Sequence, residues 1–389
     1  MLKTLFRKTP VAWLQMSRQK ARLLVAIAGI TFADVLMFFQ LGMRDALYDS
    51  QVRPYASLQG DLFLVNKRSD NLSSVRSFPR DNLYRTLGVP GVDSVNTLYL
   101  GQADWRNPEN QATRRIFVYG IDPYQPAFIF PELDQHLDEL KLLNRVVFDR
   151  AGGLPQLGDV PTLLEQEDTL TAQVNDLEVQ VVGLFVLGAS FSANGNLLTS
   201  DSTFLRLFSE RQANDIDVGV IKLAEGASVE ALQAEIQAIM PNDLRVVTIE
   251  EFTELELAFW TAGSPIGFIF GAGAGIGFLI GAVIVYQIIY TDVANHLPEY
   301  ATLKAIGYSD RYLMGVLVQE SLILACLGFI PGFVLSAQLY ALFQSATLLP
   351  VAMKVSRATL VLILTIAMCV GGGAVAMQKL RQADPADIF

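Results

Sequence analysis

The chain has 389 residues, of which 51% are hydrophobic, and its mean hydropathy is +0.35. This value is high for a soluble protein and low for one that lies entirely in a membrane, so both kinds of region are expected. The two cysteines lie in apolar runs, and the two histidines have no cysteine or histidine at ligand spacing. These features argue against a disulfide framework and a zinc site.

The net charge of −10 is distributed unevenly along the chain. Residues 1–22 contain six basic residues and no acid, whereas residues 44–256 contain 17 Lys and Arg against 32 Asp and Glu. A basic foot and an acidic body are typical of a membrane-anchored chain, and argue against nucleic-acid binding. Residues 1–22, interrupted at Pro10, are expected to form a cytoplasmic amphipathic helix on the bilayer.

The first apolar run, residues 23–43, is long enough to cross a bilayer, which takes about 20 residues. The basic residues before it place the N-terminus in the cytoplasm. Cleavage as a signal peptide at Ala26–Ala28 is rejected, because it would leave an apolar region shorter than the ~7–15 residues required. Asp34 lies inside this span at a cost of ~2.5–3.5 kcal/mol, so it should face protein or a cavity. A gating or interface residue and a hydrogen-bonded packing residue both fit.

Three further spans are expected, at residues 263–290, 313–343 and 359–377. Four spans return the C-terminal tail, residues 378–389, to the cytoplasm. The segment 291–312 is then cytoplasmic, and residues 44–262 form a domain outside, attached through helical stalk segments.

Residues 44–262 contain two β-α-β patterns, in residues 56–103 and 218–248. Each has a short helix between strands, and Ser228 is expected to cap the second helix. Together they predict a ferredoxin-like subdomain, interrupted by a mostly β insertion at about 104–217. The fold class is therefore an α-helical membrane protein with four spans and a large α+β periplasmic domain.

Motifs for catalysis or nucleotide binding are absent from the sequence. There is no G-x-x-x-x-G-K-[ST] loop and no G-x-S-x-G elbow. The run GAGAGIG has no dinucleotide-binding register, and its glycines, including Gly271, Gly273 and Gly277, recur at the spacing used for close helix packing. Glu320, early in the third span, either answers a positive charge at the cytoplasmic boundary or extends to the membrane surface.

The segment HLPEYATLKAIGYSDRYL, residues 296–313, lies between the second and third spans. Pro298 and Glu299 start a helix, the acid lying near its positive end. Leu303, Ala305 and Ile306 supply apolar side chains, and Gly307 is a natural stop. A short helix between two spans can act as a handle that moves them together, although a solvated connector would have the same pattern.

LPEYATLKAIGYS resembles the cytoplasmic coupling segment of the MacB/FtsX-like ABC permeases, in which E-x-x-x-L-K-A-I-G precedes the third span. The topology of one span, a large periplasmic domain and three spans is similar too, as are QES at Gln319–Ser321 and the DPADIF ending. PVAWLQMSRQKARLLVAIAGITFADVLMFFQLGMRDALYDS, residues 10–50, resembles the DevC family of cyanobacteria. On this resemblance, the ATPase-coupling residues are Pro298, Glu299, Leu303, Lys304, Ala305, Ile306, Gly307 and Tyr308.

The resemblance implies a non-catalytic permease that forms a homodimer and has no cofactor of its own. ATP and Mg are bound by a separate DevA-like ATPase. A DevB-like periplasmic adaptor and a TolC-like outer-membrane channel complete an exporter for glycolipid-like or other amphipathic cargo. An FtsX-like permease that activates a cell-wall hydrolase, and a lipoprotein-releasing permease, are alternatives. A stand-alone membrane enzyme is disfavoured, because no catalytic constellation is seen.

Overall fold

The chain forms two compact units. The helix unit comprises residues 1–45, 266–343 and 351–389, and the sheet unit comprises residues 46–265 and 344–350. The computed structural model describes residues 20–152, 156–167, 169–190, 193–295, 302, 306, 308–347 and 349–381. Residues 1–19 of the predicted amphipathic helix, residues 296–301, 303–305 and 307 of the segment 291–312, and residues 382–389 of the tail therefore lie outside the described residues.

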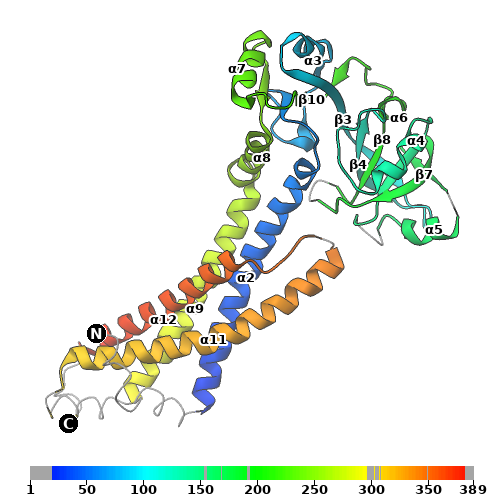
Figure 1. The fold of residues 1–389 in the computed structure, drawn as a ribbon. Coiled ribbons are helices and arrows are strands. Elements are labelled where there is room, and N and C mark those ends of the chain that lie inside the picture. The colour runs from blue at the N-terminus through cyan, green and yellow to red at the C-terminus, as the bar shows by residue number, and fades with distance from the viewer. Residues whose placement is uncertain are drawn as a thin grey trace. The chain divides into compact units, whose positions relative to one another are not determined.

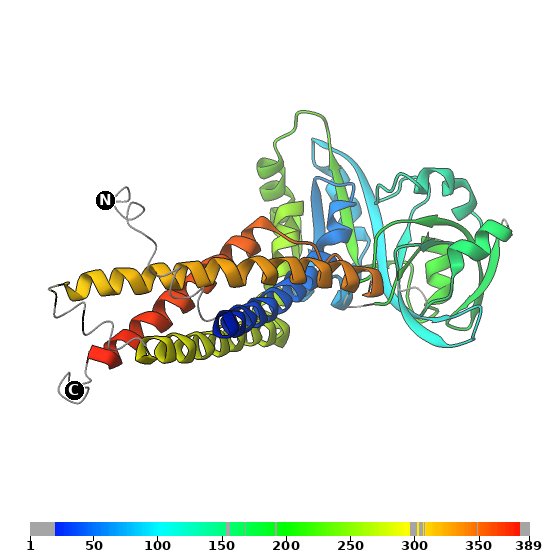
Figure 2. The same ribbon diagram turned by 90° about the horizontal axis from the view of Figure 1, so that it is seen from below.

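The helix unit confirms the prediction of four apolar helices (Figure 1). In the described part of the chain, four helices are long and apolar enough to cross a membrane: α2 (Lys20–Ala56), α9 (Pro265–Asn295), α11 (Asp310–Thr347) and α12 (Val355–Arg381). They lie side by side in both views (Figures 1 and 2). Each observed helix is longer than the predicted span, because polar residues at its ends continue the helix beyond the apolar run.

The core of the helix unit draws side chains from all four helices. Ile30 and Ala33 of α2 pack with Val285 of α9, Leu317 of α11 and Met368 of α12. Large apolar residues on the outside, such as Phe268, stay exposed, as expected for helices whose surroundings are lipid tails.

The sheet unit is built on one nine-stranded sheet with the order β11-β1-β10-β3-β4-β8-β5-β7-β6. The strands of this sheet are β1 (Leu62–Asn66), β3 (Val92–Arg106), β4 (Thr113–Ile121), β5 (Arg145–Asp149), β6 (Leu170–Val174), β7 (Leu177–Phe185), β8 (Asn196–Ser200), β10 (Val218–Leu223) and β11 (Leu244–Val247). A second sheet pairs β2 (Phe78–Pro79) with β9 (Asp215–Ile216). The α-helices of the sheet unit are α3 (Asp81–Arg85), α4 (Leu137–Leu140), α5 (Val160–Gln166), α6 (Asp201–Leu207), α7 (Val229–Ile239) and α8 (Ile249–Ala258).

The four strands at one end of the large sheet come from the two predicted β-α-β patterns. In the order β11-β1-β10-β3, each is antiparallel to its neighbour. Strand β1 is buried on both faces, because its alternate side chains enter two different cores: Leu62 and Leu64 enter one, Phe63 and Val65 the other. Two apolar faces require cover on both sides of the sheet.

The remaining strands close into a ring. The far end of β3 pairs with β4, and Trp105 and Arg106 also pair with β6. The successive pairings β3-β4-β8-β5-β7-β6-β3 form a six-stranded barrel. Trp105 is fully buried within this core, 5.1 Å from Phe148 between ring centroids, and its indole N–H donates to the Leu157 carbonyl at 2.9 Å. Burying the indole with its N–H satisfied avoids the cost of an unpaired donor.

Local sequence signals explain the helix starts of the sheet unit. Ser228 accepts a hydrogen bond from the Ala231 N–H and caps α7, as expected. Thr248 and Glu251 form a reciprocal capping box at the start of α8, a combination that satisfies two backbone donors.

One expected boundary falls inside a strand. The predicted limit between the first half of the ferredoxin-like subdomain and the insertion, at about residue 104, lies within β3, because this strand runs on from one sheet region into the barrel. Pro79 lies in β2, and α3 begins after it, at Asp81. Residues 344–350, which follow the predicted third span, group with the sheet unit.

Candidate functional site: polar contacts along helix α2

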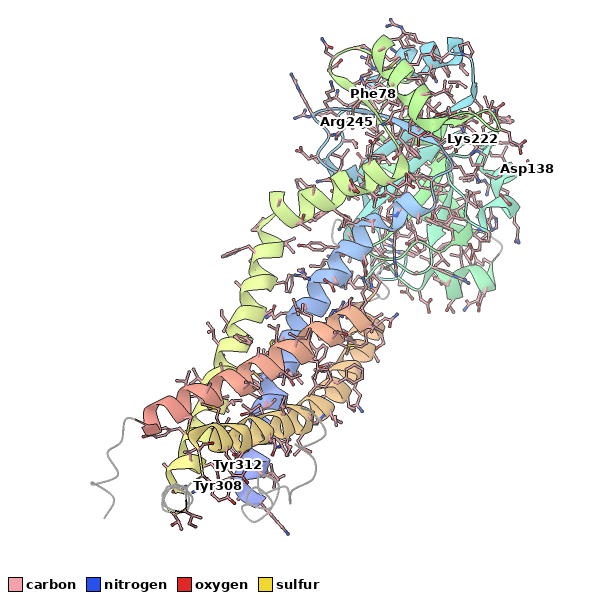
Figure 3. The ribbon with its side chains drawn as sticks, turned by 60° about the vertical axis from the view of Figure 1, so that its left-hand side comes forward. Phe78, Asp138, Lys222, Arg245, Tyr308 and Tyr312 are labelled. Atoms are coloured by element: carbon pink, nitrogen blue, oxygen red, sulfur yellow. The ribbon has the colours of Figure 1, made fainter. Side chains whose placement is uncertain are left out.

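The coupling segment can be described at two of its eight predicted residues. Pro298, Glu299, Leu303, Lys304, Ala305 and Gly307 lie outside the described residues. Ile306 is 70% exposed, and its N–H donates to the Thr302 carbonyl at 3.1 Å, a helix-type bond. The ring of Tyr308 packs against that of Tyr312 in a tilted arrangement, with centroids 4.8 Å apart, at the start of α11 (Figure 3). An exposed apolar side chain beside an aromatic pair provides a surface that another protein can contact.

Asp34 lies fully buried between α2, α11 and α12. Its Oδ1 is 2.6 Å from the Thr365 hydroxyl of α12, and this hydroxyl is also 2.8 Å from the Val361 carbonyl. The backbone of Gly332 in α11 lies against the Asp34 side chain. Among the described residues, Asp34 Oδ2 has no hydrogen-bond partner. Asp34 thus faces protein, as expected, and contacts α12 through one hydrogen bond and α11 through packing against Gly332.

The predicted glycines of α9 have two different surroundings. A Cβ on Gly273 would lie 2.6 Å from the Gln40 side chain, and one on Gly277 would lie 3.3 Å from Leu36, both on α2. These two glycines therefore allow α9 to approach α2 closely. A Cβ on Gly271 would have no heavy atom within 4 Å among the described residues. Close packing within this chain does not explain Gly271.

Glu320 lies buried on α11, at the end of the helix unit where α9 ends and α11 begins. This end is called the coupling end below. Glu320 lines a small hollow together with Asp292 of α9 and Arg22 of α2. This hollow brings Arg22, from the basic segment at the start of the chain, near Glu320. That Glu320 answers a positive charge stays a prediction.

The opposite end of the helix unit holds a polar cluster that the sequence analysis missed. Arg357 of α12 is only 4% exposed. Its Nη2 and Nε lie 2.8 and 3.1 Å from Asp45 Oδ2 of α2. The guanidinium lies 5.3 Å from the ring centroid of Tyr340 in α11 and donates to the Ala352 carbonyl at 3.0 Å. The Tyr340 hydroxyl in turn donates to the Phe38 carbonyl of α2. We call Asp45, Tyr340 and Arg357 the arginine clamp.

The arginine clamp ties α2, α11 and α12 together by charge and by a cation–π contact. Arginine suits this position better than lysine, because its planar guanidinium can donate several hydrogen bonds and pack on an aromatic ring at the same time. A sequence signal did exist, because Arg357 is a charge in the first turn of an otherwise apolar helix. Charges at such positions are costly without a partner. What the sequence did not supply was the partner, which is 312 residues away.

The sheet unit has its own buried carboxylate, Glu256 of α8, which is 1% exposed. Its Oε2 accepts from the Tyr55 hydroxyl at 2.5 Å and from the Leu72 N–H at 2.9 Å, and its Oε1 accepts from the Trp260 indole N–H at 2.7 Å. Burial raises the pKa of Glu256, although the three donors oppose this shift. We call Glu256, Tyr55, Leu72 and Trp260 the glutamate joint.

The glutamate joint holds the end of α2 against α8, because Tyr55 belongs to α2. Tyr55 also packs edge-to-face on Phe252 of α8, with ring centroids 4.7 Å apart. Three donors around one carboxylate fix the positions of three backbone segments at once. The arrangement is suited to holding segments together and has no nucleophile or base facing a substrate pocket.

Other chemistry has little support in the described residues. Within them, no three His, Cys, Asp or Glu side chains are grouped so as to hold a metal ion. Asp34, Asp45 and Tyr55 instead share one helix, α2, at three successive levels. These groups make structural contacts, Asp34 and Asp45 within the helix unit and Tyr55 within the sheet unit.

Comparison with known proteins relates both halves of the chain to transport proteins. Residues 262–385 match the family model of the FtsX-like permease C-terminal domain. An uncharacterized ABC transporter permease of Mycobacterium tuberculosis (strain H37Rv) is 21% identical over 381 residues, covering 96% of this chain and 97% of that protein. Another from Methanocaldococcus jannaschii is 26% identical over 280 residues, covering 69% and 67% respectively.

Among solved structures, the periplasmic region of MacB from Actinobacillus actinomycetemcomitans is similar to part of the chain. It has a TM-score of 0.36 and 13% identity, and the match covers 51% of this chain and 92% of that one. From the sequence matches, the chain is similar along nearly its whole length to ABC transporter permeases, and residues 262–385 match the FtsX-like family model.

Proposed function

We propose that this chain, an ABC transporter permease of the FtsX type, passes the motion of a separate ATPase to its own sheet unit. The observation that carries the proposal is helix α2. It runs unbroken from Lys20 to Ala56. It bears three of the residues described above: Asp34, Asp45 of the arginine clamp and Tyr55 of the glutamate joint. A continuous helix held at each level transmits displacement instead of bending.

The ATPase is proposed to act on residues 291–312, through Pro298, Glu299, Leu303, Lys304, Ala305, Ile306, Gly307 and Tyr308. The exposed Ile306 and the Tyr308–Tyr312 pair at the start of α11 support this assignment. Displacement of this segment would move α9 and α11, and the arginine clamp would carry it from α11 and α12 to α2. ATP and Mg belong to the partner subunit, and this chain is non-catalytic.

The sheet unit is proposed to be periplasmic and the two chain termini cytoplasmic, in an inner (plasma) membrane. The excess of basic residues in residues 1–22 supports this orientation. The strand order β11-β1-β10-β3, with α3 and α7 as the connecting helices, supports a ferredoxin-like porter subdomain. The barrel is then the inserted part of that subdomain.

The wider assembly is proposed to be a tripartite exporter of the DevC type. A homodimer of this chain would work with a DevA-like ATPase, a DevB-like adaptor and a TolC-like channel to export glycolipid-like or other amphipathic cargo. The resemblance of residues 10–50 to the DevC family supports this choice. A homodimer also gives a use to Gly271, which packs against nothing within the described chain.

Co-purification tests the proposal. The full chain, tagged at its C-terminus and extracted gently from membranes, should bring down an ATPase and a periplasmic adaptor. Recovery of an ATPase with a cell-wall hydrolase or its activator would favour the signalling alternative instead. Absence of any ATPase would contradict the proposal.

A further inference from the structure

A hollow with mostly apolar walls lies between α2 and α9 at the coupling end of the helix unit. Its volume is about 320 Å³, and it is lined by Ala21, Arg22, Val25, Gln287, Ile288 and Thr291. Val25, on its wall, is 63% exposed. The two helices pack closely further along, where a Cβ on Gly277 would already touch Leu36.

The residues beside the hollow are typical of a membrane–water boundary. On α9, Tyr286 and Tyr290 stack with ring centroids 5.8 Å apart, directly beside the lining residues Gln287 and Thr291. Tyrosines are enriched where a membrane helix leaves the hydrocarbon region. Lys20, one turn before the apolar run of α2, is exposed. A molecule in the hollow would therefore have one end in hydrocarbon and the other among lipid headgroups.

The charges define which headgroup fits. Arg22 supplies the only full charge among the lining residues, and residues 1–22 carry six basic residues and no acid. Arg22 also lines the smaller hollow that contains Asp292 and Glu320. Two carboxylates repel a phosphate from that smaller hollow, so an anionic group is directed to the larger one. Arginine binds phosphate oxygens in a forked geometry.

We infer that this hollow is a binding site for an anionic phospholipid of the cytoplasmic leaflet. An acyl chain lies along Val25 and Ile288, and the headgroup phosphate is bound by Arg22, with Lys20 adding to the attraction. The inference rests on the proposed orientation of the chain, because the basic end must meet the leaflet that carries anionic lipid. Bound lipid would bridge the inner ends of α2 and α9, next to the coupling segment.

Native mass spectrometry of the full chain tests the inference. The protein is purified in detergent and titrated with phosphatidylglycerol or phosphatidylcholine of the same acyl chains. We expect phosphatidylglycerol to be retained more strongly, and Arg22→Gln to weaken its retention by about fivefold, the effect of one basic residue near an anionic headgroup. Arg22→Lys should keep most of the preference. Arg114→Gln, which removes an exposed charge from the barrel, is the matched control and should have no effect.

A second variant tests the apolar half of the site. Val25→Trp fills the hollow from an exposed position and should reduce retention of both lipids while Arg22 stays in place. Equal retention of the two lipids by the wild type, or unchanged retention in Arg22→Gln, would overturn the inference. Loss of dimer mass in Val25→Trp without loss of lipid would assign the hollow to a second copy of the chain. None of these readouts needs an ATPase, so failure of the proposed function is detected separately.

Discussion

Two buried carboxylates, one in each unit, differ in how completely they are held. Glu256 of the sheet unit accepts three hydrogen bonds, and both of its oxygens are used. Asp34 of the helix unit has one hydrogen bond to Thr365, and its second oxygen has no partner in the part of the chain that the structure describes. A fully satisfied group opposes rearrangement, whereas a partly satisfied one has little to lose.

The same contrast extends to packing. The sheet unit has two continuous cores of large side chains, whereas α9 meets α2 largely through glycines. Among the described residues of the helix unit, the arginine clamp is the cluster whose buried charge has about as many polar contacts as the glutamate joint. The difference teaches that the sheet unit is held by bulky packing and satisfied polar groups, whereas α9 meets α2 through small residues. Under the proposed function, the sheet unit would move as a body and the helices would shift against one another around the clamp.

The largest effect is expected at the arginine clamp. Asp45→Ala leaves Arg357 buried without its carboxylate, and we expect the stability of the chain in detergent to fall by about 3–5 kcal/mol. Thermal unfolding followed by circular dichroism measures the loss. The control is Arg44→Gln, which removes the more exposed partner of the same carboxylate and should cost less than about 1 kcal/mol. Equal losses in the two variants would show that the clamp is no more than a surface ion pair.

The next largest effect is expected at the glutamate joint. In Glu256→Gln, an amide N–H₂ group replaces one of the two oxygens that now accept hydrogen bonds, so a donor would face a donor. We expect the free energy of unfolding to fall by about 1–3 kcal/mol. Because the Trp260 indole contacts Glu256, the emission of this tryptophan should shift with the substitution, and fluorescence during urea unfolding reports both effects. A replacement that leaves stability and emission unchanged would contradict the joint.

The glutamate joint also has a predicted pH dependence. Burial raises the folded-state pKa of Glu256 above its ordinary value of 4.5, so the folded chain binds more protons than the unfolded chain between these two values. Its contribution to stability is therefore fullest below pH 4.5 and falls as pH rises through the folded-state pKa. Glu256→Gln, which cannot titrate, should remove this part of the slope. An identical slope in the variant would assign it to other groups.

A smaller effect on stability is expected from substituting the glycines of α9, and it should differ between Gly277 and Gly271. Gly277→Leu inserts a side chain against Leu36 and Met37 of α2 and should cost about 1–3 kcal/mol through overpacking. Gly271→Leu places the same side chain where nothing lies within 4 Å among the described residues, so a monomer should tolerate it. Thermal unfolding compares the two, and size-exclusion chromatography shows whether Gly271→Leu disrupts a dimer instead.

The smallest stability effect is expected at Asp34. Asp34→Asn keeps a group that can hydrogen-bond to Thr365 and removes only an oxygen without a described partner. We expect a change below about 1 kcal/mol, in contrast to Glu256→Gln. A loss as large as that of Glu256→Gln would show that Asp34 is held as firmly as the glutamate joint, and the comparison between the two units would fail.

Much of this architecture could be predicted from local patterns. Runs of about 20 apolar residues identify membrane helices without any tertiary information, and Ser228 with its apolar spacing identifies α7. The barrel could not be predicted, because its closing pair joins Trp105 of β3 to Val174 of β6. The clamp was missed for the same reason: nothing near Asp45 in the sequence indicates Arg357.

The measurement that most directly tests the account is hydrogen–deuterium exchange of the full chain in nanodiscs with its ATPase, with and without ATP. We predict that ATP changes the exchange of the glutamate joint, at Tyr55 and α8, in the wild type. Gly307→Pro, which breaks the proposed handle, should still fold and bind the ATPase, but its joint should not respond to ATP. An equal response in Gly307→Pro, or no response in the wild type, would contradict transmission from the coupling segment to the sheet unit.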